Sequence, residues 1–150
     1  MSAGVPERHA DPRVALVIAR FEALAPEDVS RMAALYTEGA SFKDPFNAVR
    51  GISAIEQIFR HMFVALEQPR FVIRDAILQG DQCFLTWDFL FRMRRFSRDE
   101  QVIHGGSHLR FAPDGRIEMH RDYWDAAEEL YEKLPLLGGL MRWLKRRANT

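Results

Sequence analysis

Apolar residues recur with two different periods along this chain, helical in the first part and strand-like in the second. Asp11 and Pro12 combine a helix N-cap with a proline at the first helical position. The helix that they open carries an apolar stripe at spacings of three and four residues: Val14, Val17, Ile18, Phe21 and Leu24. Pro26 opens a second, short helix that Gly39 is expected to end, with an apolar face made of Val29, Met32 and Tyr36.

A short strand and a third helix are predicted next. The strand has the sequence SFKDPF, residues 41–46. The helix is expected to begin at Ser53, because Ser53 and Glu56 have the spacing of a capping box. It is expected to stop at Pro69. Its buried stripe consists of Ile55, Ile58, Phe59, Met62, Phe63 and Leu66.

Four segments rich in β-branched and aromatic residues follow, and they predict strands over 71–79, 83–95, 101–112 and 116–124. Gly80-Asp81 and Pro113-Asp114-Gly115 are hairpin turn sequences, so the strands that they join should run antiparallel. Helices first and an antiparallel meander afterwards indicate the α+β class.

Both ends of the chain are expected to lie outside this domain. Residues 1–11 read as a flexible tail and residues 12–133 as the domain. A final helix is predicted to begin near Asp125 and to break at Pro135, and residues 134–150 form a basic amphipathic extension. We expect the extension to pack on the domain or on a partner. The alternative is contact with an anionic membrane surface through residues 136–148.

Composition indicates one soluble globular domain, since 47% of the 150 residues are hydrophobic and 28% are charged. The 21 basic and 21 acidic residues cancel, so no global field draws the chain to nucleic acid. Cys83 is the single cysteine, which excludes an intrachain disulfide and fits a reducing cytosol. Residues 1–12 lack the apolar run of a secretory signal, and no stretch approaches the ~20 apolar residues that span a bilayer. We therefore expect a cytoplasmic protein.

Three aspartates stand among apolar residues in the predicted strands. Strand side chains alternate between the two sides of a sheet, so Asp44 shares a face with Phe42, and Asp122 shares one with His120 and Trp124. Asp88 lies in a strand that is apolar on both faces. A lone buried acid costs several kcal/mol unless it is paired, solvated or protonated. We therefore predict that Asp44, Asp88 and Asp122 converge on one partly wet pocket.

Each of these residues also has a structural interpretation. Asp44 can cap the turn before Asn47, and Asp88 can serve structure as well as function. Asp122 can form an ion pair with an arginine of a neighbouring strand: Arg92, Arg94 or Arg110. His120 can shuttle protons or form part of the pocket wall. His104 and His108 fall opposite Ser107 by alternation and are expected to lie outside the pocket.

Three stretches carry a resemblance to a known family: LYTEGASFKDPFNAVRG, GISAIEQIFRHMF and GRIEMHRDYWD. In these stretches, and in the order of its predicted elements, the chain resembles the SnoaL-like branch of the nuclear transport factor 2-like superfamily over residues 12–133. The resemblance implies a curved sheet wrapped around helices into a cone, with an apolar pocket inside. It also implies dimers formed through the outer sheet face. Members include both enzymes and binding proteins, so the resemblance specifies the fold more closely than the function.

The resemblance to ketosteroid isomerases of this fold assigns Asp44, in KDPF, to the position of the general base. Their enolate is held by a tyrosine and a protonated aspartic acid, and Phe21 and Ser107 stand at those positions here. Losing one such donor typically costs ~10²–10³ in rate, so the resemblance does not carry steroid isomerisation over to this chain.

The resemblance to limonene-epoxide hydrolases places their two catalytic aspartates on Asp88 and Asp122. The arginine between them in their relay is replaced by Thr86. SnoaL-type polyketide cyclases use one pocket acid as general acid and base, which Asp122 or Asp44 can supply. A metal site built from His120, Asp88 and Asp122 is chemically feasible, but no spacing specifies it, and we assign no metal or cofactor.

The expected function is therefore binding of a small, largely apolar organic molecule, with cofactor-independent acid/base chemistry such as isomerisation, cyclisation, or addition or removal of water. The expected catalytic residues are Asp44, Asp88, Asp122 and His120. The expected substrate-binding residues are Phe21, Phe42, Phe59, Phe63, Thr86, Ser107, Leu109 and Trp124. A homodimer is the expected assembly. The alternative function is a non-catalytic ligand-binding or dimerisation module.

Overall fold

The computed structural model describes residues 8–94, 99–125, 143 and 146–147. The helix predicted from Asp125, its break at Pro135 and most of the basic extension lie outside the described residues. Residues 1–7 of the predicted tail lie outside them as well.

One six-stranded sheet organises the chain, with strand order β2-β1-β6-β5-β4-β3. The strands are β1 (Tyr36–Lys43), β2 (Ala48–Arg50), β3 (Leu66–Gln79), β4 (Gln82–Met93), β5 (Gln101–Phe111) and β6 (Ile117–Tyr123). Neighbouring strands run antiparallel except β1 and β6, which are parallel. The predicted α+β class and the four predicted strands β3 to β6 are confirmed, although β1 and β6 form one parallel pair within an otherwise antiparallel sheet.

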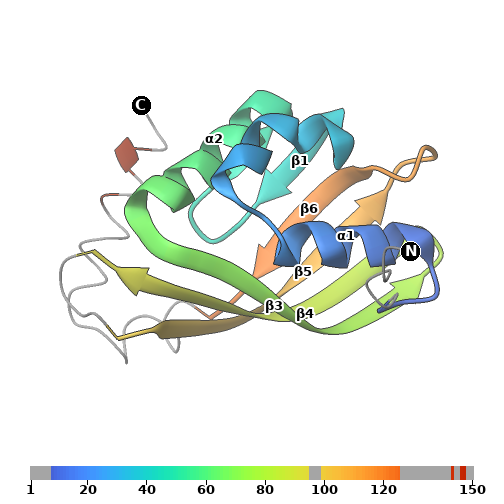
Figure 1. Ribbon diagram of the computed structural model, residues 1–150. Coiled ribbons are helices and arrows are strands. Elements are labelled where there is room, and N and C mark those ends of the chain that lie inside the picture. Colours follow the sequence, from blue (N-terminus) through green and yellow to red (C-terminus); the bar gives the residue numbers. More distant parts are fainter. Residues whose placement is uncertain (1–7, 95–98, 126–142, 144–145, 148–150) are drawn as a thin grey trace, which may run out of the picture.

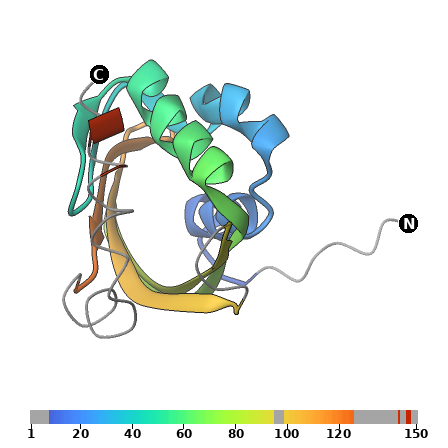
Figure 2. The same ribbon diagram turned by 90° about the vertical axis from the view of Figure 1, so that its left-hand side faces the viewer.

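Three helices cover one face of this sheet. They are α1 (Pro12–Glu22), the 3₁₀ helix η1 (Pro26–Ala34) and α2 (Ile52–Ala65). Figure 2 shows the sheet curving round and the helices closing over its concave side. We call the side of the sheet that faces the helices the inner face and the opposite side the outer face. The cone-like fold expected from the resemblance is therefore present (Figure 1).

Local capping sequences correctly predict the start of one helix, α1, but not that of α2. Asp11 caps α1 as predicted, because its carboxylate accepts the Arg13 backbone N–H at 2.9 Å. The capping box predicted at Ser53 is wrong: α2 begins at Ile52 after Gly51, whose φ of +97° favours glycine.

Two predicted helix ends are also wrong. Gly39 does not end the second helix, since β1 has already begun at Tyr36 to pair with β6. Pro69 does not stop α2, which ends at Ala65. Pro69 instead lies in the edge strand β3, where the register with β4 shifts between Glu67 and Arg70, and a proline is tolerated at such an irregularity.

The core lies between the inner face and the helices, and a glycine in β5 lets one large side chain fit there. Trp87 in β4 is the cross-strand partner of Gly105 in β5. A Cβ atom at Gly105 would lie 2.4 Å from the Trp87 ring, so the indole covers a position where only glycine leaves room. This placement carries the indole across β5 toward Ser107.

We expect Gly105→Ala to lower the free energy of unfolding by about 1–3 kcal/mol, because the added methyl group overpacks against the Trp87 ring. Gly39→Ala is the matched control, since a Cβ atom there meets nothing within 4 Å, and its effect should stay within about 0.5 kcal/mol. Urea denaturation measures both. Equal effects of the two substitutions would contradict this packing account.

Candidate active site

A continuous chain of hydrogen bonds crosses the inner face and links five side chains from four strands. Trp87 Nε1 donates to Ser107 Oγ at 2.9 Å, and Ser107 Oγ donates to Asp122 Oδ1 at 2.5 Å. His120 Nε2 lies 2.6 Å from the same Oδ1, and the Tyr36 hydroxyl lies 2.7 Å from His120 Nδ1. Sheet register brings these groups together, because Ser107 pairs directly with Asp122 across β5 and β6.

The hydrogen-bond partners determine the proton positions in this chain. Burial raises the pKa of Tyr36 well above its ordinary value, and the charge of Asp122 raises it further, so the phenol keeps its proton. We assign the Tyr36 O–H as the donor to His120 Nδ1. Nε2 then carries the ring proton and donates it to Asp122. Every donor in the chain is directed, in one or two steps, toward the Asp122 carboxylate.

The chain runs from the closed core to a position that solvent reaches. Three aromatic rings surround the His120 imidazole, with centroid distances of 4.6 Å for Phe42, 5.8 Å for Phe21 and 6.0 Å for Tyr36. His120 is only 4% exposed, whereas the Asp122 side chain is 16% exposed. Asp122 is therefore the member of the hydrogen-bonded chain that is most accessible to a molecule entering from solvent.

Asp44 lies in the turn between β1 and β2 and not within the predicted strand. Its Oδ1 accepts the backbone N–H groups of Phe46 at 2.8 Å and Asn47 at 2.6 Å, and the Asn47 amide contacts both oxygens at 3.1 Å. The turn-capping interpretation of Asp44 is thus confirmed.

Asp44 nevertheless lies close enough to Asp122 for the two charges to interact. Burial raises the pKa of Asp44 although these hydrogen bonds oppose the shift, and the charge of Asp122 raises it further. Because the pKa is higher in the folded than in the unfolded chain, this carboxyl lowers stability as the pH rises through and above 3.8.

The prediction that Asp88 faces the same pocket is wrong. Asp88 projects from the outer face of β4, where Arg74 bonds its Oδ2 at 2.6 and 2.8 Å and His104 bonds its Oδ1 at 2.5 Å. The Arg74 guanidinium lowers the pKa of Asp88. Strand alternation puts Asp88 on the opposite side of the sheet from Trp87. The sequence did not show that Arg74 and His104 would bond Asp88 on the outer face. The metal trio His120, Asp88 and Asp122 is excluded for the same reason.

Thr86 was also expected in the pocket, and it too lies on the outer face, where it bonds Asp75. His104 and His108 lie outside the inner face as predicted, with His108 bonded to Gln82 at 2.9 Å. Arg110 is exposed on the outer face, and Asp122 bonds Ser107 and His120 in place of that arginine.

The expected substrate-binding residues divide into a closed and an open group. Phe21, Phe42, Phe59 and Leu109 are buried in the core, where the first three contact one another edge-on or tilted. Phe63 and Trp124 are partly buried, and Trp124 packs against Phe46 of the Asp44 turn at 5.3 Å. Phe63 and Trp124 are therefore the more exposed of these apolar residues.

Two members of the hydrogen-bonded chain were not predicted. Tyr36 was placed on a helix face, and Trp87 was not among the expected site residues. The signal for Trp87 was present in the sequence: it is the large residue opposite a glycine, on the same side as Ser107. Tyr36 had no such signal, because its partner is 84 residues away.

Comparison with known proteins identifies the family. Residues 17–120 match the SnoaL-like domain family, so the chain belongs to it. The matched segment includes Tyr36, Asp44, Trp87, Ser107 and His120 and ends two residues before Asp122. None of the curated proteins matches the sequence.

Solved structures with this fold are distant in sequence. A protein assigned to the SnoaL-like polyketide cyclases from Shewanella putrefaciens CN-32 has a TM-score of 0.71 at 14% identity, covering 85% of this chain and 99% of that one. An epoxide hydrolase similar to limonene-epoxide hydrolase, from M. tuberculosis, has a TM-score of 0.67 at 19% identity, covering 85% and 93%. A hypothetical protein with a ketosteroid isomerase-like fold from Catenulispora acidiphila DSM 44928, in complex with trimethylamine, has a TM-score of 0.69 at 14% identity, covering 82% and 92%.

Within the described residues, no helix has the length and apolar character needed to cross a membrane.

We expect Asp122→Asn to lower the pKa of Asp44, because the substitution removes a negative charge that raises it. Carboxyl ¹³C NMR titration of wild type and variant measures this shift. Asp88→Asn is the control: it removes a carboxylate from the outer face and should leave the Asp44 titration unchanged. An Asp44 pKa that responds to Asp88 but not to Asp122 would contradict the described geometry.

Proposed function

We propose that this protein binds a small, largely apolar organic molecule beside Asp122 and moves a proton with that carboxylate. The observation that carries the proposal is the convergence of two hydrogen-bond donors, Ser107 and His120, on Asp122 Oδ1. A carboxylate held in this way on rigid strands has a fixed position and a fixed orientation. Catalytic proton transfer depends on such positioning.

The two oxygens of Asp122 have different tasks in this proposal. Oδ1 accepts from His120 and Ser107, and these bonds stabilise the carboxylate while it is charged. Among the described residues no donor bonds Oδ2, so its lone pairs are available to a substrate C–H or to a water molecule. A proton taken there and returned at another atom gives isomerisation or cyclisation. A proton taken from water gives addition of water. None of these reactions needs a cofactor.

Tyr36 is a positioning residue in this scheme. Its hydroxyl bonds Nδ1 of His120 deep in the core and thereby keeps the ring proton on Nε2, facing Asp122. Being fully buried, it does not itself reach a substrate.

Asp44 is the second ionisable group of the proposed site. Burial raises its pKa, so we assign Asp44 the role of proton donor and Asp122 that of proton acceptor. Two carboxyl groups in different environments serve as acid and base in many enzymes. Oδ1 of Asp44 accepts three N–H groups and Oδ2 accepts one, so Oδ2 is the oxygen that would carry the proton.

The proposed ligand class follows from the side chains nearest these acids. Phe46 and Trp124 form a partly exposed aromatic contact beside the Asp44 turn, and Phe63 adds further apolar surface. The structural neighbour that holds trimethylamine supports a small organic ligand for this fold. The competing function is ligand binding without chemistry. The burial of Phe21, Phe42, Phe59 and Leu109 does not separate the two functions, because it reduces the room on the inner face for any ligand.

We expect Asp122→Asn to reduce turnover by ~10²–10⁴-fold, because the amide cannot accept the proton. The assay presents a panel of small apolar ketones and epoxides in D₂O and detects deuterium incorporation or water addition by mass spectrometry. Asp88→Asn is the matched control and should retain wild-type turnover, since Asp88 lies on the outer face.

Two other outcomes decide between the proposal and its rival. If Asp122→Asn and wild type turn over a substrate equally, Asp122 is not the proton acceptor. If wild type binds a panel member, as seen by native mass spectrometry, without changing it, the protein is a binder.

A further inference from the structure

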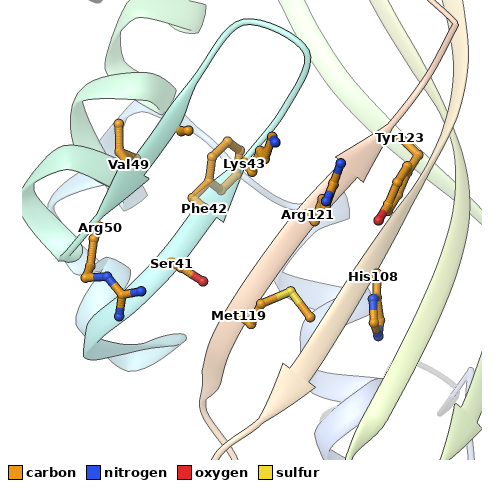
Figure 3. A pocket seen from close by; sticks show the side chains of 10 residues that line it. Ser41, Phe42, Lys43, Val49, Arg50, His108, Met119, Arg121 and Tyr123 are labelled. Carbon is orange, nitrogen blue, oxygen red and sulfur yellow. The ribbon is translucent and has the colours of Figure 1, made fainter.

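The outer face of the sheet has a hollow that the proposed active site does not use. It has a volume of about 540 Å³ and crosses four neighbouring strands, β2, β1, β6 and β5. Figure 3 shows its side chains standing on these strands. Small residues, Ser41 and Ala48, lie where the hollow is, and longer side chains border it.

The charged side chains of this hollow are all cationic. Lys43, Arg50 and Arg121 line it together with His108, and none of its lining residues is a carboxylate. Within the described residues, no acidic side chain lies within ion-pair distance of Lys43, Arg50 or Arg121. The arrangement is local, because acidic and basic residues are equal in number over the whole chain.

Sheet register places three of these groups in one row. Lys43 on β1 is the direct partner of Arg121 on β6, and Arg121 is the direct partner of His108 on β5. Like charges directly opposite one another destabilise a sheet. Elsewhere on the same face the chain avoids this cost, since Arg74 bonds Asp88. An anion bound between Lys43 and Arg121 would relieve the repulsion in the row.

Apolar groups and one aromatic ring complete the hollow. The Arg121 guanidinium lies 4.8 Å from the centroid of the Tyr123 ring, and stacking there holds the guanidinium plane while its N–H groups stay available to an oxyanion. Met119 supplies apolar contact surface. The cations therefore suit a charged headgroup, and the remaining lining suits an organic body.

We propose that this hollow binds a small organic phosphate, whose dianionic headgroup bridges Lys43 and Arg121. Arginine forms bidentate hydrogen bonds with phosphate, and lysine adds a point charge. A second copy of this chain whose two-fold axis passed through the hollow would bring the same cations against each other, so we choose an anion as the occupant of the hollow. The site is independent of Asp122, which lies on the inner face.

The test uses phenyl phosphate as the probe and phenol as its neutral counterpart. Calorimetry on the full chain should detect phenyl phosphate binding that weakens as salt is raised to ~0.15 M, and no comparable binding of phenol. Arg121→Gln and Lys43→Gln should each weaken binding by about tenfold or more, the effect of losing a charge-assisted hydrogen bond. Arg60→Gln, an exposed arginine on α2, is the matched control and should bind as wild type.

NMR and sedimentation distinguish the remaining outcomes. Amide shifts on adding phenyl phosphate should cluster at residues 41–43, 48–50 and 119–123, and they should persist in Asp122→Asn. Loss of these shifts in Asp122→Asn would place the probe in the inner site and overturn the proposal. So would equal binding by Arg121→Gln and wild type. A dimer that covers this face and is dissociated by Arg121→Glu in sedimentation equilibrium would likewise overturn it.

Discussion

A buried imidazole must have both of its ring nitrogens hydrogen-bonded, and this requirement at His120 shapes the inner face of the sheet. Phe21, Phe42 and Tyr36 exclude water from the ring, so its partners have to be side chains. Tyr36, at the start of β1, is the partner of Nδ1. Asp122, which lies two residues after His120 on β6, is the partner of Nε2. The orientation of the Asp122 carboxylate is thus a by-product of satisfying a histidine in the core. A reactive group gains its position from a packing constraint.

The two faces of the sheet differ in the charged groups that they carry. On the inner face, the Asp122 carboxylate bonds Ser107 and His120, and aromatic rings enclose the imidazole. On the outer face, cations gather over β1 and β6, while Asp88 is neutralised by Arg74 over β4. Because successive strand residues point to opposite sides, β6 alone contributes Asp122 to the first environment and Arg121 to the second. One strand therefore contributes to both proposed sites, which differ in the charge of the ligand that we propose for them.

Much of the architecture was predictable, because it depends on local patterns. The apolar stripe of α1, the Asp11 cap and the two hairpin turns are signals within a few residues, and the structure has each of them. The start of β1 was not predictable in this way, since a distant strand decides it. Pro69 failed as a helix stop because an irregular edge strand accommodates it equally well.

The site was predictable in part for a similar reason. Alternation correctly grouped His120, Asp122 and Trp124, and it correctly removed His104 and His108 from the inner face. It could not decide which side Asp88 takes in a strand that is apolar on both faces. The outward choice depends on Arg74, which lies next to a register shift in β3 that no sequence pattern marks.

The parallel pairing of β1 with β6 joins the first long strand of the sheet to the last. A contact between such distant parts of a chain requires a large loop to close, so it is costly until the intervening elements have folded. The bond between Tyr36 and His120 crosses this closure. A chain that emerges and folds only as far as β5 therefore has neither the fixed histidine nor the oriented carboxylate. The geometry proposed for proton transfer therefore requires that β6 has paired with β1.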